Sequence, residues 1–119
     1  MESNILYDKT LSFSIRIVNL YKYLNEQKGE YIMSKQLLRS GTSIGANVSE
    51  SISAESTLDF IHKLAISQKE TDETLYWLTL LYKTDYLSEL EYTSITDDCI
   101  EIRKLLVSIA LTLKKKNNS

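Results

Sequence analysis

Hydrophobic residues recur at helical spacing along the whole chain, in four segments separated by short polar breaks. The spacing predicts helices over about residues 4–26, 31–54, 57–83 and 88–115. Gly29 suits a left-handed helix end, Ser56 or Thr57 suits a helix N-cap, and Ser88 with Glu91 has the form of a capping box. Because every connection is short, we expect one domain of all 119 residues, an all-α, antiparallel, up-down-up-down four-helix bundle.

The last segment has the most regular pattern. Its apolar residues alternate in steps of four and three, which is typical of a coiled-coil-like seam: Ile95, Cys99, Ile102, Leu106, Ile109 and Leu113. Cys99 is therefore interpreted as a small buried apolar residue. A reactive thiol is the alternative, but neither a histidine nor a cluster of cations lies beside it in the sequence.

The first segment has two apolar stripes, although a single bundle core requires one. The first stripe is Leu6, Phe13, Ile17, Leu20 and Leu24, and the second is Tyr7, Leu11, Ile15 and Val18. The two lie about 140° to 160° apart around the helix. We expect the second stripe to pack on a neighbouring subunit, in a surface extended by Trp77, Val107 and Leu111; ordinary surface hydrophobicity is the alternative.

Residues 37–51, LLRSGTSIGANVSES, have the composition of a loop but the apolar spacing of a helix. The helical interpretation places on one face Leu37, Gly41, Ile44, Val48 and Ile52. Gly41, Gly45 and Ser49 then form a small-residue track that another helix can approach closely, at a cost of about 1 kcal/mol per glycine. A phosphate-binding loop is disfavoured, because the Gly-Lys-Ser/Thr order is missing and no strand signal precedes it.

A polar layer is predicted between the second and third segments. Its members are Arg39, Ser43, Asn47, Glu50, Glu70 and Glu73. If the two helices fold back at about residue 55, Arg39 meets Glu70 or Glu73, whereas Arg39 and Glu50 lie too far apart on one helix to pair. The layer either fixes helix register or lines a site for a ligand or partner.

Composition and charge limit the function classes. The chain has no proline and only three glycines, which favours helices, and its formal net charge of −2 with a pI near 5.4 counts against a nucleic-acid binder. Residues 1–12 lack the basic start and the apolar run typical of a signal peptide, no apolar stretch approaches the length that spans a membrane, and the single cysteine cannot form an internal disulfide. These features predict a cytoplasmic protein.

No set of residues specifies a reaction, so no catalytic residue, metal or cofactor is predicted. A di-metal carboxylate site needs two Glu-x-x-His pairs, and the single histidine, His62, is interpreted as a surface pair with Asp59. The basic tail consists of Lys114, Lys115 and Lys116. These lysines complement the negative end of the last helix, and on an oligomer they are candidate phosphate contacts.

Residues 37–81 carry a specific pattern, Arg-Ser/Ala-x-x-Ser-Ile-x-x-Asn-Ile/Val-x-Glu followed by a helix with Phe, Lys-Glu, Glu and Tyr-Trp. It falls on Arg39, Ser43, Ile44, Asn47, Glu50, Phe60, Lys69, Glu70, Glu73, Tyr76 and Trp77. In this pattern the chain resembles a known family, the 23S rRNA intervening-sequence proteins. Two positions depart from it: Gly45 replaces a frequent proline, and Ser51 replaces a frequent glycine or alanine.

The resemblance implies a ring-like homopentamer of four-helix bundles without catalytic activity. It also implies an association with RNA, since some members are encoded within 23S rRNA genes and a related bundle is an accessory protein of diversity-generating retroelements. The first hypothesis is thus a non-enzymatic homo-oligomeric scaffold that engages RNA or a nucleic-acid-processing protein. The second is a mobile-element-associated protein-interaction assembly without nucleic-acid contact. A small-molecule enzyme is the third.

Overall fold

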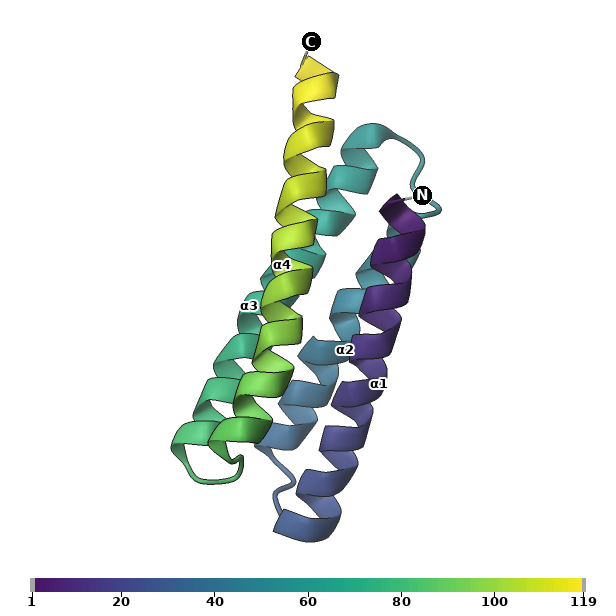
Figure 1. Cartoon of the computed structure of the whole chain (residues 1–119). Coiled ribbons are helices and arrows are strands. Elements are labelled where there is room, and N and C mark those ends of the chain that lie inside the picture. The colour runs from purple at the N-terminus through teal and green to yellow at the C-terminus, as the bar shows by residue number, and fades with distance from the viewer. Residues whose placement is uncertain (1, 119) are drawn as a thin grey trace.

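The computed structural model describes residues 2–118, with side chains from residue 5 onward, and consists of four helices. They are α1 (Glu2–Lys28), α2 (Met33–Ser51), α3 (Thr57–Lys83) and α4 (Glu89–Asn118). Each helix packs antiparallel to the next, and the last turns of α4 extend beyond the other helices (Figure 1). The predicted all-α four-helix bundle is therefore confirmed for the described residues.

The helix bounds differ from the predicted ones mainly in α2. This helix begins at Met33 and ends at Ser51, inside the predicted 31–54. Ile52, which the sequence pattern assigned to the apolar face, lies just past the end of α2 and is exposed. Conversely, α1 and α4 are longer than predicted, because helical structure continues through their polar ends.

Local signals set the connections between helices. Gly29 adopts a left-handed φ of 65°, and Asp85, after α3, adopts a φ of 70°. The Ser56 side chain accepts a hydrogen bond from the backbone N–H of Asp59. Ser88 and Glu91 form the reciprocal capping box, with N···O distances of 3.1 and 2.8 Å. The capping positions expected from the sequence are thus occupied.

Glu30 caps α2, a role the sequence pattern did not reveal. Its carboxylate accepts hydrogen bonds from the backbone N–H groups of Ile32, Met33 and Ser34, and the residue is only 7% exposed. The first N–H groups of a helix have no partner within it, and negative charge is favourable there. Glu30 therefore supplies the cap that Ile32, at the N-cap position, has no polar side chain to provide.

Replacing Glu30 with alanine should lower the free energy of unfolding by about 1–2 kcal/mol, because three N–H groups lose their acceptor. Urea denaturation followed by the fluorescence of Trp77, the single tryptophan, measures this loss. Glu26→Ala, on the exposed end of α1, is the matched control and should change stability by less than about 0.5 kcal/mol. Equal effects of the two substitutions would contradict the cap.

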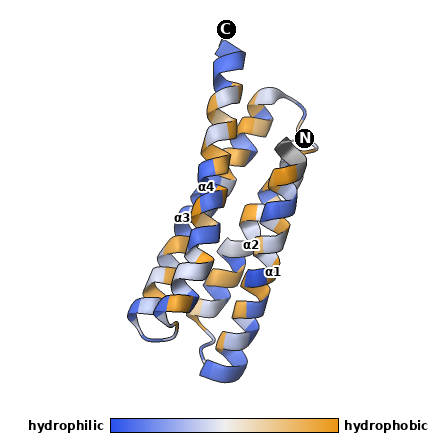
Figure 2. Cartoon of the chain, viewed as in Figure 1, coloured by the Kyte–Doolittle hydropathy of each residue, from blue (hydrophilic) through white to orange (hydrophobic). Residues whose placement is uncertain are grey.

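The core follows the predicted apolar positions of the outer helices. Phe13, Ile17 and Leu24 of α1 are buried, as are Cys99, Ile102 and Leu106 of α4, while Leu20 and Leu113 are half-buried. Hydrophobic and hydrophilic positions alternate along each helix in Figure 2, as one buried face per helix requires. Burial raises the pKa of the Cys99 thiol to about 12, so this side chain behaves as a core residue in the folded state.

Candidate interaction surfaces

The α2/α3 side of the bundle brings together part of the predicted polar layer. Arg39 of α2 forms ion pairs with Glu70, at 3.2 Å, and with Glu73 of α3. The indole N–H of Trp77 donates to the same Glu73 carboxylate at 3.1 Å. The Arg39 side chain remains 48% exposed, so this cluster lies on the surface of the subunit.

Electrostatics in this cluster favour the charged forms. Hydrogen bonds from Arg39 and then from Trp77 hold the pKa of Glu73 below its ordinary value. The hydrogen bonds with Glu73 and then Glu70 raise the pKa of Arg39. Arg39, Glu70 and Glu73 therefore bind one another, in an arrangement suited to helix register or to surface recognition.

The other predicted members of the layer do not join this cluster. The Ser43 hydroxyl donates to the Arg39 carbonyl, and the Asn47 amide donates to the Ser43 carbonyl, so both bind the backbone of their own helix. Glu50 lies near the end of α2 and pairs with Lys63 at 3.4 Å. The six residues thus form separate local contacts along the α2/α3 surface.

Arg39→Ala should lower the free energy of unfolding by less than about 1 kcal/mol, because the ion pairs are substantially exposed. This differs from the loss of a few kcal/mol that a buried pair would give. Since the folded-state pKa of Glu73 lies below its unfolded value, the stabilisation is present at neutral pH and disappears as the pH falls through the folded pKa. Urea denaturation at pH 7 and at about pH 3 measures both effects; a loss above about 2 kcal/mol would contradict surface exposure.

Beneath this cluster, buried hydroxyl groups join α2 to α3. Ser67 donates to the backbone carbonyl of Ile44 at 2.8 Å, and the hydroxyls of Thr74 and Ser40 lie 3.0 Å apart. In the sequence, residues 67–74, SQKETDET, form one polar run. Within this run, Ser67, Thr71 and Thr74 together with Leu78 repeat the core periodicity with small polar residues, and this spacing is the signal of their burial.

The small-residue track faces α1. A Cβ added at Gly41 would lie 2.8 Å from Ile17 side-chain atoms, and one at Gly45 would lie 3.2 Å from the Thr10 backbone carbonyl oxygen. Glycine at these positions lets the two helices approach more closely than a side chain would allow. Ser49, the third member of the track, lies at the exposed edge of the same contact.

An apolar surface flanks this contact. Of the α1 stripe, which is Tyr7, Leu11, Ile15 and Val18, the first three residues are exposed, Leu11 at 47% and Ile15 at 55%, and Val18 is half-buried. Tyr7 and Leu11 also line a groove of about 270 Å³ whose α2 side consists of Thr42, Gly45, Ala46 and Ser49. The stripe and the groove together are called the α1/α2 face below.

Trp77 does not extend the α1/α2 face. It lies on α3, which is diagonal to α1 in the bundle, and α2 separates the two. Leu111 lies on α4, in a second group of exposed apolar residues on α3 and α4 that includes Leu58, Tyr76 and Ile100, and Val107 of α4 is half-buried. The structure therefore has two apolar surfaces on opposite sides, the α1/α2 face and this α3/α4 face.

The remaining residues considered in the sequence are the single histidine, the groups that can bind metal and the basic end of α4. His62 is exposed, and no interaction with Asp59 joins the two side chains into the predicted pair. Among residues 5–118, no three His, Cys, Asp or Glu side chains gather to hold a metal ion. No described helix is apolar enough over a sufficient length to cross a membrane. Lys114, Lys115 and Lys116 are exposed on the hydrophilic end of α4 (Figure 2).

The comparisons with known proteins settle the family. Residues 2–108 match the model of the 23S rRNA-intervening sequence protein family. The chain belongs to this family. The chain is 55% identical in sequence to a protein of unknown function from the S23 ribosomal protein family of Bacteroides thetaiotaomicron, and its structure matches the crystal structure of that protein with a TM-score of 0.91. The match covers 92% of this chain and 98% of that one. Among curated proteins, none matches.

The resemblance inferred from residues 37–81 is thus confirmed and extends over most of the bundle. In this 23S rRNA-intervening sequence protein, Gly45, in place of the frequent proline, lies against Thr10 and Ser14 of α1, and Ser51 is buried with its hydroxyl bonded to the Val48 carbonyl. Both residues that depart from the family pattern lie within the continuous helix α2. The family match ends at residue 108, so the basic end of α4 lies outside it.

Proposed function

We propose that this chain is a non-enzymatic homo-oligomeric scaffold that assembles through its α1/α2 face and associates with RNA. The observation that supports assembly is the outward α1 stripe beside the α1/α2 groove. Contiguous exposed apolar residues next to a groove are typical of protein–protein interfaces, and the core of a single subunit leaves this stripe uncovered.

The second apolar surface supports a cyclic arrangement. A ring needs two different complementary surfaces on each subunit, whereas a two-fold dimer buries one surface against itself. The α3/α4 face, which includes Leu58, Tyr76 and Leu111, lies on the opposite side of the bundle from the α1 stripe. We therefore propose that the α1/α2 face of one subunit binds the α3/α4 face of the next. The number five for this ring comes from the family resemblance.

RNA association is proposed for the basic end of α4. Lys114, Lys115 and Lys116 lie where α4 extends beyond the bundle, and a ring would repeat them once per subunit (Figure 1). Clustered lysines bind phosphates with a strong dependence on salt. The formal net charge of −2 per chain opposes RNA binding and favours the second candidate, a protein-interaction assembly without nucleic-acid contact.

A salt-dependent titration separates these two functions. The purified chain is titrated with structured and with single-stranded RNA at about 50 and 200 mM salt, and its mass is measured in the same samples. We expect binding that weakens at least about tenfold at the higher salt. Replacement of Lys114, Lys115 and Lys116 with glutamine should abolish it.

The matched control replaces Lys22, Lys35 and Lys83, three exposed lysines at the other end of the bundle, with the same loss of charge. This control should retain most of the binding. No binding at low salt would overturn RNA association and support the protein-interaction assembly. Equal loss in the two triple variants would overturn the assignment to the end of α4.

A further inference from the structure

Each pair of neighbouring helices in the bundle meets along a line of contact, called a seam below, and the four seams are not equivalent. Three of them join helices that are consecutive in the chain, so a loop connects each pair. The fourth, the α1/α4 seam, joins the first and last helices without a loop, and α1 packs less closely on α4 than on α2. Only non-covalent contacts therefore hold this side of the bundle together.

The three loop-connected seams have buried contacts. At the α1/α2 seam Gly41 lies directly against Ile17, and at the α2/α3 seam the Ser67 hydroxyl donates to the Ile44 carbonyl. At the α3/α4 seam the buried Cys99 thiol donates to the Thr71 carbonyl at 3.7 Å, and the half-buried rings of Tyr82 and Tyr92 stack with centroids 4.5 Å apart. Separating any of these pairs removes close contacts that water does not replace.

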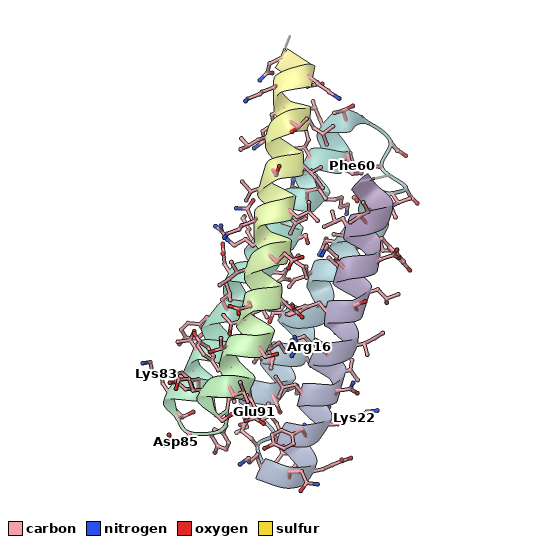
Figure 3. The ribbon with its side chains drawn as sticks, viewed as in Figure 1. Arg16, Lys22, Phe60, Lys83, Asp85 and Glu91 are labelled. Carbon is pink, nitrogen blue, oxygen red and sulfur yellow. The ribbon has the colours of Figure 1, made fainter. Side chains whose placement is uncertain are left out.

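The polar contacts across the α1/α4 seam are exposed. Arg16 pairs with Asp98 at 2.6 Å and also donates to the Ser94 hydroxyl and carbonyl, at 2.9 and 3.3 Å. Figure 3 shows Arg16 between the two helices. Lys9 pairs with Glu101, and all four charged side chains of the two ion pairs are 40–60% exposed. Exposed ion pairs contribute little and are screened by salt.

Open grooves accompany these ion pairs. A groove of about 480 Å³ lies between the helices on one side of the Arg16–Asp98 pair, with Leu20, Tyr23 and Leu87 in its lining. A second groove of about 350 Å³ lies on the other side, against Phe13 and Ile102. Core side chains therefore line surface grooves at this seam, so the seam is incompletely packed.

We propose that the α1/α4 seam is a salt-sensitive joint, at which α1 and α4 separate while the other three seams remain packed. The two exposed ion pairs close the joint, and opening exposes the apolar lining of the grooves. This inference depends on the contacts within one subunit and is independent of the proposed assembly. It predicts an open state that forms without global unfolding.

The reporter of this opening is Ile102→Cys, because Ile102 is buried and lines the second groove together with Phe13 of α1. It is combined with Cys99→Ser, because the thiol of Cys99, the single native cysteine, donates to the Thr71 carbonyl of α3, across a seam that stays packed. Alkylation by iodoacetamide, an uncharged reagent, requires the thiol to reach solvent. The labelling rate of the full chain is divided by that of the urea-unfolded chain at the same pH and salt, which removes effects on the intrinsic reaction.

We expect the labelling rate to be nearly independent of urea at low concentrations, because a joint exposes much less surface than global unfolding. Raising the salt concentration from about 0.05 to 1 M should increase the rate about twofold or more. A rate that follows the urea dependence of global unfolding at every concentration would overturn the proposal.

Two arginine variants locate the opening. Arg16→Gln should accelerate labelling by about threefold, the size expected from losing an exposed ion pair. Arg39→Gln removes two exposed ion pairs at the α2/α3 seam and should leave the rate at low urea unchanged. Equal acceleration by the two variants, or none by Arg16→Gln, would place the opening elsewhere and overturn the proposal.

Discussion

Gly41→Leu is expected to lower the free energy of unfolding by about 3 kcal/mol or more. Even the first carbon of a side chain at this position would lie 2.8 Å from Ile17, which is completely buried and branched at Cβ. The gain in helix propensity, about 1 kcal/mol, does not offset this overlap. Urea denaturation followed by Trp77 fluorescence measures the change.

Ala65→Leu, on the exposed side of α3, is the control for a larger side chain without overlap and should change stability by less than about 0.5 kcal/mol. Gly45→Leu should be intermediate. Its Cβ would lie 3.2 Å from the Thr10 carbonyl oxygen, but the adjoining groove leaves room for the rest of the side chain. Wild-type stability for Gly41→Leu would show that α1 does not approach α2 as closely as the structure has it.

The double substitution Leu11→Lys, Ile15→Lys is expected to convert the assembly into single chains of 13.7 kDa. Both side chains are about half exposed in one subunit, so lysine fits there without disturbing the core. In the assembly, the same positions would place uncompensated charge in an apolar interface. Sedimentation velocity measures the mass, and circular dichroism verifies that the separated chains remain helical.

Leu90→Lys is the control for this pair, because Leu90 is 82% exposed but borders the groove of the α1/α4 seam. It should leave the mass unchanged. If the double variant kept the wild-type mass, the α1/α2 face would not be an interface. If both variants dissociated, the effect would be one of charge in general and not of this face.

Periodicity was sufficient to predict the bundle and one of its helix contacts. The four apolar patterns gave four helices, and a fold-back near residue 55 placed Arg39 level with Glu70 and Glu73, as the structure has them. The same geometry aligns Ser67 with Ile44. Register between consecutive antiparallel helices is predictable because a short loop fixes which residues lie side by side.

Features that depend on side-chain type or on non-consecutive helices were not predictable in this way. Ser67 and Thr74 fall within the polar run of residues 67–74, and a buried hydroxyl bonded to a neighbouring helix gives no apolar signal in the sequence. The role of Glu30 as a cap of α2 depends on one side chain, so it leaves no periodic pattern in the sequence. Trp77 was grouped with the α1 stripe, because the sequence does not show which helices are diagonal.

The mass of the wild-type chain in solution tests the central proposal, self-assembly through the α1/α2 face, most directly. We would measure it by native mass spectrometry and sedimentation equilibrium over a range of micromolar concentrations. We expect a single closed species whose mass is a multiple of 13.7 kDa, fivefold for the ring that the family resemblance implies. A mass of 13.7 kDa at all concentrations would contradict assembly and leave the α1 stripe as ordinary surface hydrophobicity.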